Sequence, residues 1–352
     1  MLTVYEMTDD DVSHRSFQSR NERHGSFISF CDARPKRTLA VAILMIENEG
    51  SKKESLETLS STHSQSLPHS MATAALTKVS AASEEFRKKL AAILSLHGFD
   101  ICHLFHTQWY NQLLDNDQRL ASLVRLPVTG NAFLIGNTKR LWPCFLTWLK
   151  QQQLQQPDGG IPPNPLDTYV SQQITTIIRQ HVVGDDDDDD AVDIFWDHEW
   201  DKDKLVSMSR VASVSGLCYL HPSALLCIHP TYGAWFSLRA VVVVHDDDDD
   251  DDTAETCHSP PPPPPLLCNP LSPEQDENVQ AAARRAFDHH ANVFDDDTTA
   301  RVRAEEAAQP WIQLRDAVSI GREYRFSDNQ LHYHYLKDTR LLVKEMAKIP
   351  SR

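Results

Sequence analysis

The segment Leu225–Val244, LLCIHPTYGAWFSLRAVVVV, has the pattern of a β-hairpin and decides the fold class. Its first part, Leu225–Pro230, is a short apolar run. Thr231–Gly233 follows as a compact connection, with a glycine where a positive φ is expected. Ala234–Val244 is rich in aromatic and β-branched residues and is predicted to be the second strand. Because a hairpin joins antiparallel strands, the sequence predicts an antiparallel sheet.

Alternation along the second predicted strand gives it two faces. Arg239 lies mid-strand among aromatic and aliphatic neighbours, and arginine is almost never fully buried without a partner. Two interpretations therefore stand side by side: a structural ion pair, or an arginine that binds an anionic ligand. The first face carries Ala234, Phe236, Leu238, Ala240 and Val242, and the second carries Trp235, Ser237, Arg239, Val241 and Val243.

The net charge of −16 comes mainly from two aspartate runs, Asp185–Asp190 and Asp246–Asp252. Removing their thirteen charges leaves −3, so the folded body is close to neutral. Such runs stay solvated and are read as inserts. No basic stripe with interleaved aromatic residues occurs, which argues against a nucleic-acid partner.

Of the 352 residues, 41% are hydrophobic, enough for a sizeable core. No apolar run reaches the ~18–20 residues of a membrane helix, and the start lacks the pattern of a secretory signal. The seven cysteines make no CxxC pair and are expected to be reduced thiols. A cytoplasmic protein without a membrane segment is the expectation.

The expected organisation is a disordered extension over 1–75 and one domain over 76–348, with low-complexity inserts near 184–190 and 245–271. Inside the domain, 204–220 is predicted to be a helix of small residues. Its small side chains suit either tight helix packing or a large flat ligand. The second insert contains six consecutive prolines, Pro260–Pro265, read as a linker in preference to a docking ligand.

Several segments together resemble one family. CIHPTYGAWFSLRAVVV is similar to the CIHPxFGGWFxIRGVV hairpin of the cblC-type vitamin B12-processing proteins (the MMACHC family; cyanocobalamin reductase / alkylcobalamin dealkylase). GFDICHLFHTQWYNQLL resembles the family's GFExxPFxxxWYNxLL, and 310–330 resembles W…YRDAV…ERYSxxQ with two extra residues. The resemblance extends over about 84–348, apart from the inserts.

The resemblance implies an α+β, flavin-nitroreductase-like fold, an antiparallel sheet flanked by helices. It implies cobalamin bound with its lower base detached, cyanide removal by electrons from FAD or FMN, and alkyl removal by glutathione. NADPH would be the indirect electron source through a flavin reductase. A cblD-type B12-trafficking protein and methionine synthase are candidate partners.

Residue by residue, the resemblance assigns glutathione positioning to Arg239, Arg315 and Arg340, the last after a one-residue gap. Ser213 stands where family members have a histidine, so an imidazole role there is in doubt. No protein metal site is expected, since the corrin carries the cobalt. The implied cobalamin contacts are Asp197, Val206, Ser207, Met208, Ser209, Tyr219, Cys227 and Leu238.

Two alternatives from other functional classes stay open. The first is a cobalamin chaperone without turnover, which glutathione-dependent loss of the alkyl ligand would exclude. The second is a flavin reductase that never binds a corrin, which a base-off cobalamin spectrum would exclude.

Overall fold

The computed structural model describes residues 81–128, 131–155, 160–183, 191–199, 201–245, 262–293 and 300–350. The predicted extension 1–75 and both aspartate runs lie outside these ranges. No helix in the described part of the chain is long and apolar enough to cross a membrane.

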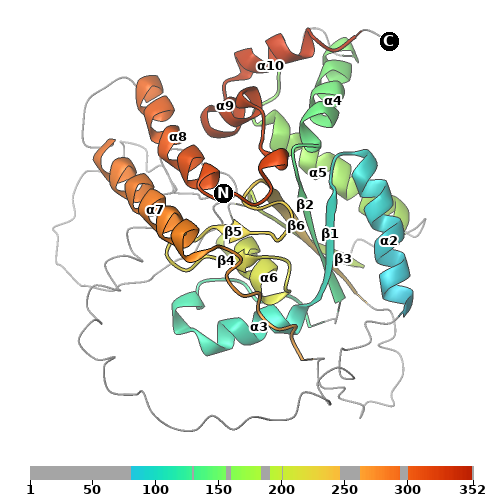
Figure 1. Ribbon diagram of the computed structural model, residues 1–352. Helices are drawn as coiled ribbons and strands as arrows, with labels where there is room; N and C mark the ends of the chain where they lie inside the picture. Colours follow the sequence, from blue (N-terminus) through green and yellow to red (C-terminus); the bar gives the residue numbers. More distant parts are fainter. Residues whose placement is uncertain are drawn as a thin grey trace, which may run out of the picture.

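The centre of the fold is a four-stranded antiparallel sheet in the order β1-β2-β6-β3, beside a two-stranded ribbon of β4 and β5 (Figure 1). The two inner strands, β2 and β6, are buried on both faces, which explains why their sequences NAFLIGN and SLRAVVVV are almost continuously apolar. The strands are β1 (Ile101–His106), β2 (Asn131–Asn137), β3 (Val192–Trp196), β4 (Tyr219–Leu220), β5 (Cys227–Ile228) and β6 (Ser237–Val244).

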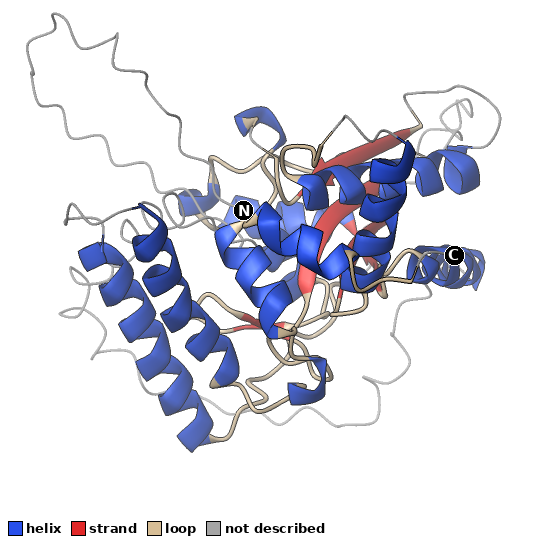
Figure 2. Cartoon of the chain, turned by 90° about the horizontal axis from the view of Figure 1, so that it is seen from above, coloured by secondary structure: helices blue, strands red, loops and turns tan. Residues whose placement is uncertain are grey.

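Helices cover both faces of the sheet. One face packs on α2, α4, α5 and α10, and the other packs on α3 and α6. A third cluster joins the α7–α8 pair and α9 to β5 and to Trp235, and the pair stands to one side of the sheet (Figure 2). The helices are α2 (Ala81–Leu96), α3 (Thr107–Asn116), α4 (Leu141–Gln155), α5 (Pro165–Ile178), α6 (Met208–Val214), α7 (Pro273–Val293), α8 (Ala300–Asp316), α9 (Asp328–Leu336) and α10 (Thr339–Met346).

The predicted hairpin over Leu225–Val244 is wrong in its pairing. Strand β5 pairs with β4, whereas β6 pairs with β2 and β3. A single bridge between His229 and Gly233 is what remains of the hairpin. The glycine does take a positive φ, 56°, as expected. The chain therefore uses this turn to pass from the small ribbon to the central sheet.

The predicted faces of the second strand are also wrong, because a β-bulge interrupts the alternation at Arg239. Along β2, Ile135 pairs with Ala240 and the next residue, Gly136, pairs with Leu238. The skipped residue shifts the alternation by one position. Leu238 consequently packs on the same face as Val241 and Val243, while Ala240 and Val242 lie on the other.

The predicted helix over 204–220 is much shorter, since only Met208–Val214 is helical. It ends in a Schellman motif: Leu217 N donates to Ala212 O (2.9 Å) and Gly216 N donates to Ser213 O (3.1 Å). Gly216 has a φ of 76°, which ends the helix and directs the chain into β4.

The sequence after Ser327 predicts a final helix to about Ala347 with Ser327 as its N-terminal cap, but the structure divides this helix into α9 and α10. Ser327 caps α9 as predicted, by accepting a hydrogen bond from Gln330 N. The division occurs at Lys337, whose φ of 53° cannot continue a helix. Asp338 then caps α10.

Candidate functional site

A hollow lies where α6, β5, the turn before β6 and the end of α8 meet. Three residues assigned from the sequence, Ser209, Cys227 and Arg315, line it together. Its cavity volume is about 10 Å³, room for about one water molecule and far below the ~300–1,000 Å³ of ordinary small-molecule pockets. The lining is mostly apolar with one cation: Ser209, Leu225, Leu226, Cys227, Ala234, Phe236 and Arg315.

Arg315, in the last turn of α8, is the cation of this hollow and is only 3% exposed. Its guanidinium carbon lies 5.8 Å from the ring centres of both Trp235 and Phe326, so two aromatic rings hold it in place. Nη1 is fully buried and has no hydrogen-bond partner among the described residues. Because an uncompensated buried charge is costly, this side chain is suited to an anionic ligand.

Arg325 lies 5.4 Å from the Trp235 ring centre, yet its bonding is different. Its Nε donates to Asp316 Oδ1 (2.8 Å) and Nη1 donates to Asp328 Oδ1 (3.0 Å). Hydrogen bonding to Asp316 and then to Asp328 raises the pKa of Arg325 against the opposing effect of burial. Of these two arginines beside Trp235, only Arg315 faces the hollow.

Cys227 is buried in the floor of the hollow, and its thiol donates a long hydrogen bond to Ser209 O (3.8 Å). The pKa of this thiol is raised well above its usual range, first by the hydrogen bond with Cys218 and then by burial. The nearby carboxylate of Asp197 acts in the same direction, while Arg315 opposes it. The thiol therefore stays protonated near neutral pH, which agrees with a lining role rather than a nucleophilic one.

Arg239 and Asp197 lie on adjacent strands of the sheet. Arg239 is 4% exposed, and its Nε donates to Asn137 Oδ1 at 2.7 Å. Asp197 N donates to Arg239 O (2.9 Å) and extends the β3–β6 ladder by one bond. The bulge thus places a buried guanidinium on a central strand, but neither residue is among those that line the hollow.

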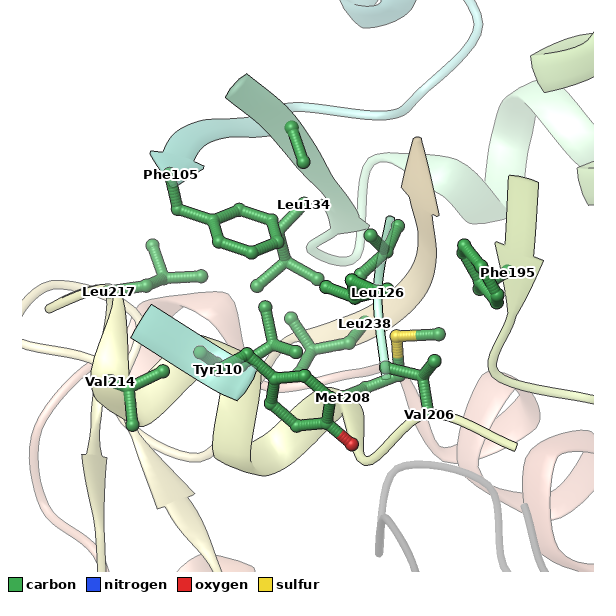
Figure 3. Packing of buried hydrophobic residues seen from close by; sticks show 14 of the residues in the cluster. Phe105, Tyr110, Leu126, Leu134, Phe195, Val206, Met208, Val214, Leu217 and Leu238 are labelled. Atoms are coloured by element: carbon green, nitrogen blue, oxygen red, sulfur yellow. The ribbon is translucent and has the colours of Figure 1, made fainter. Parts of the chain in front are cut away.

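Three of the implied cobalamin contacts, Val206, Met208 and Leu238, are buried at the packed interface of α6 with the sheet (Figure 3), and a fourth, Ser207, is buried beside them in the chain. Ser207 N donates to the hydroxyl of Tyr110 at 3.1 Å. Burial raises the pKa of that hydroxyl to about 12, so it stays protonated. These residues fix α6 against the sheet and do not line the hollow.

The remaining sequence-assigned residues lie away from the hollow. Tyr219 is half-buried in β4, and its ring makes an edge contact with His221. Arg340 lies in the first turn of α10, is 66% exposed, and donates from Nη2 to Asp338 Oδ2 at 2.7 Å. Ser213 is half-buried near the end of α6.

Sequence reasoning missed that Phe236 lines the hollow and that Trp235 and Phe326 hold Arg315. Trp235 and Phe236 fall within the segment Leu225–Val244 from which the strand was predicted, so the sequence showed that aromatic residues occur there. Their partners come from α8 and from the chain just before α9, which the sequence pattern does not place against β6. In the described ranges, no group of three His, Cys, Asp or Glu side chains gathers as a metal site.

His229 is a second feature that the sequence did not single out. Its ring stacks on Tyr232 (4.4 Å between centres), and Nδ1 accepts from Thr231 N (3.0 Å) and Tyr232 N (3.2 Å). Burial lowers the pKa of His229 to about 4, and repulsion from His103 acts in the same direction. The neutral imidazole thereby fixes the turn that precedes β6.

Comparisons with known proteins agree with the sequence resemblance. The model of the methylmalonic aciduria and homocystinuria type C (MMACHC) family matches residues 98–259. Among solved structures, the crystal structure of a C. elegans B12-trafficking protein CblC, a human MMACHC homologue, is similar, with a TM-score of 0.51 and 15% identity. The similarity covers 77% of this chain and 98% of that chain. No curated protein sequence matches significantly.

These matches confirm the resemblance to the cblC-type family and the expected fold class. The fold is α+β and nitroreductase-like, with an antiparallel sheet flanked by helices. The family match includes Arg239 and Cys227 and ends before Arg315 and Arg340. Roles for these last two arginines therefore depend on the RDAV segment and on the geometry described above.

Proposed function

We propose that this protein processes cobalamin in the cytoplasm. It binds B12 with the lower base detached and removes the upper ligand, cyanide by reduction and alkyl groups by transfer to glutathione. The family match and the shared fold support a role in B12 handling. The observation that carries the glutathione chemistry is the buried Arg315 guanidinium, whose Nη1 has no partner among the described residues.

Glutathione carries two carboxylates, and a guanidinium binds a carboxylate through two parallel hydrogen bonds. Arg315 would supply one such clamp from the wall of the hollow, and Arg239 would supply another from the bulge of β6. Fixing the carboxylates aims the thiol of glutathione at the upper face of the corrin. The positive charge of Arg315 also favours the thiolate form, which is the nucleophile.

In the alkyl transfer, the glutathione sulfur attacks the carbon bound to cobalt. A sulfur–carbon bond forms, the cobalt–carbon bond breaks, and cobalt keeps both electrons of that bond. The thiol proton passes to solvent before the attack. For cyanide removal, a reduced FAD or FMN, renewed with NADPH by a separate flavin reductase, would supply the electrons to cobalt, and cyanide would leave as the anion. No residue of this chain is assigned to the flavin.

Cobalamin is far larger than the hollow, whose cavity volume is about 10 Å³. Its binding therefore requires the hollow to widen between α6, β5 and the end of α8. The mostly apolar lining suits the face of a corrin, and Ser209 provides a polar group for its amide arms. The candidate recipients of the product are a cblD-type B12-trafficking protein and methionine synthase.

A second candidate is a cobalamin chaperone without turnover. Arg340 favours it, because this third sequence-assigned arginine is exposed and bonded to Asp338 instead of facing the hollow. In that case the same fold would carry B12 without changing it. Added glutathione would then leave the alkyl group on cobalt.

The test is glutathione-dependent dealkylation of methylcobalamin by the wild type and Arg315→Lys, followed by absorbance. Lysine keeps the charge and loses the planar fork, so we expect the rate to fall about 10–150-fold, which corresponds to about 1.5–3 kcal/mol of charge-assisted bonding. Arg325→Lys is the matched control, since Arg325 contacts the same tryptophan but is bonded to two aspartates.

Base-off binding of cobalamin should persist in Arg315→Lys, and its melting temperature should stay near that of the wild type. A wild-type dealkylation rate in Arg315→Lys would show that Arg315 does not hold glutathione. If the wild type itself binds cobalamin base-off but leaves the methyl group in place with glutathione, the chaperone is the correct function.

A further inference from the structure

The proline-rich segment before α7 shows a three-residue repeat in its exposure. Pro264 and Leu267 are half-buried. The residues between and around them are exposed, and Leu266 is 65% exposed. The exposed members are Pro262, Pro263, Pro265, Leu266, Cys268 and Asn269. A period of three corresponds to neither an α-helix nor a strand.

Consecutive prolines explain this period. Each proline ring fixes φ near −65° and forces the preceding residue away from the helical region, so the run adopts the polyproline II helix. That helix has three residues per turn, and its cross-section is a triangle. Here one edge, formed by Pro264 and Leu267, faces the body of the protein. The two other edges, Pro262–Pro265 and Pro263–Leu266, face solvent.

Contacts at both ends hold the segment in this orientation. Pro264 rests on Gly216, with its Cγ 3.3 Å from the position that a Cβ at Gly216 would take. At the other end, Asn269 Nδ2 donates to Asp276 Oδ1 (2.6 Å) and Leu271 N donates to Asn269 Oδ1 (3.0 Å). Asp276 Oδ1 also bonds His221, so the segment is tied to α7 and to the β4–β5 loop.

We propose that this segment is a docking ligand for a protein domain with an aromatic-lined groove that reads polyproline II helices. Such grooves contact two edges of the helix and leave the third free, which matches the exposure pattern. The segment is already ordered, so a partner loses little conformational entropy on binding it.

The sequence around the segment selects among such domains. No Lys or Arg occurs between His245 and Arg284, and Asp246–Asp252 lies upstream. SH3 grooves add an acidic pocket for a basic residue, which this segment does not offer. A WW groove, in which aromatic rings clamp prolines and an adjacent apolar residue, suits the Pro263–Leu266 and Pro262–Pro265 edges. The proposed partner is therefore a WW-containing protein with a neutral or basic surface near its groove.

The test titrates an isotopically labelled WW domain with the full-length protein and follows the resonances of the groove by NMR. We expect saturable shifts of the groove aromatics. Pro262→Ala/Pro265→Ala removes one outward edge and should weaken binding by about tenfold or more, because the groove loses two ring contacts. Pro270→Ala, an exposed proline outside the run, is the matched control and should bind within twofold of the wild type.

Three outcomes would overturn the proposal. They are the absence of shifts with the wild type, equal binding by the double variant, and shifts of an SH3 domain while the WW domain stays unchanged. An unchanged melting temperature of the double variant separates loss of docking from loss of fold. The proposal does not depend on the cobalamin chemistry, since the docking edges point away from Gly216.

Discussion

At the scale of single residues, the hollow depends on how a few polar side chains are held. Arg315 is fixed by two aromatic rings and leaves Nη1 without a partner in the described structure, which is the state expected of a ligand-binding guanidinium. Cys227, on the floor, is protonated at neutral pH because of Cys218 and burial. Cys227 therefore lines the hollow as a thiol, and the proposal assigns the nucleophile to glutathione.

The pKa of His229 leads to a prediction on stability. It is about 4 in the folded protein, below the ordinary value of about 6.5, so the unfolded chain takes up the proton first as the pH falls. Stability from this residue is fully present above about pH 6.5 and is lost as the pH falls towards 4. His229→Asn keeps an acceptor for the two turn amides and does not titrate.

We therefore expect the melting temperature of the wild type to drop more than that of His229→Asn between pH 7 and pH 4.5, by about 2–4 °C. The pKa values of His103 and His106 are also lowered by burial, but both residues are present in the two proteins. Parallel pH profiles of the two proteins would show that His229 is not held neutral.

At the scale of elements, two glycine turns interlock and bring α8 to the central sheet. A Cβ at Gly233 would lie 1.8 Å from Ile320 O, and one at Gly321 would lie 2.4 Å from Tyr232 O. The backbones of the turn before β6 and of the chain after α8 thus touch directly. This contact sets where Arg315 stands relative to Phe236.

Substitution of these glycines tests the interlock. We expect Gly233→Ala to lower the free energy of unfolding by about 3 kcal/mol or more, from the positive φ and the backbone clash together. Gly160→Ala is the matched control: its φ is 64°, but nothing lies within 4 Å, so only about 1 kcal/mol should be lost. Urea unfolding gives both values, and equal losses would mean that the two backbones do not meet closely.

The sequence predicts element types better than it predicts their partners. The apolar segment Asn131–Asn137 predicts a strand and β2 covers these residues, and Ser327 caps its helix, because both features depend on local patterns. The pairing of β6 was missed, because the local sequence is the same whether β5 pairs with β6 in a hairpin or with β4 in a separate ribbon. The bulge at Arg239 was missed because its cause, the register against β2, lies about a hundred residues away.

The candidate site was predicted in the same uneven way. Ser209, Cys227 and Arg315 were assigned by resemblance, and the structure places all three around one hollow. Arg340, whose assignment needed a gap in the comparison, lies on the surface beside Asp338, and its role in binding glutathione stays a prediction. The aromatic rings around Arg315 come from parts of the chain distant in sequence, so no local pattern predicts their contact with it.

At the scale of the whole molecule, a sheet with helices on both faces carries the candidate site where α6, β5 and α8 converge. The family match and the CblC-like architecture make B12 the ligand to test first. Everything proposed for glutathione presupposes that a corrin enters beside Arg315. Detachment of the lower base is the property that separates this function from that of a flavin reductase.

The most direct measurement is an absorbance titration of cyanocobalamin with the purified full-length protein. We expect a saturable shift of the cobalamin bands to shorter wavelength, because cobalt loses its lower nitrogen ligand on binding. A spectrum that stays unchanged at tens of micromolar protein would show that this chain does not bind cobalamin base-off.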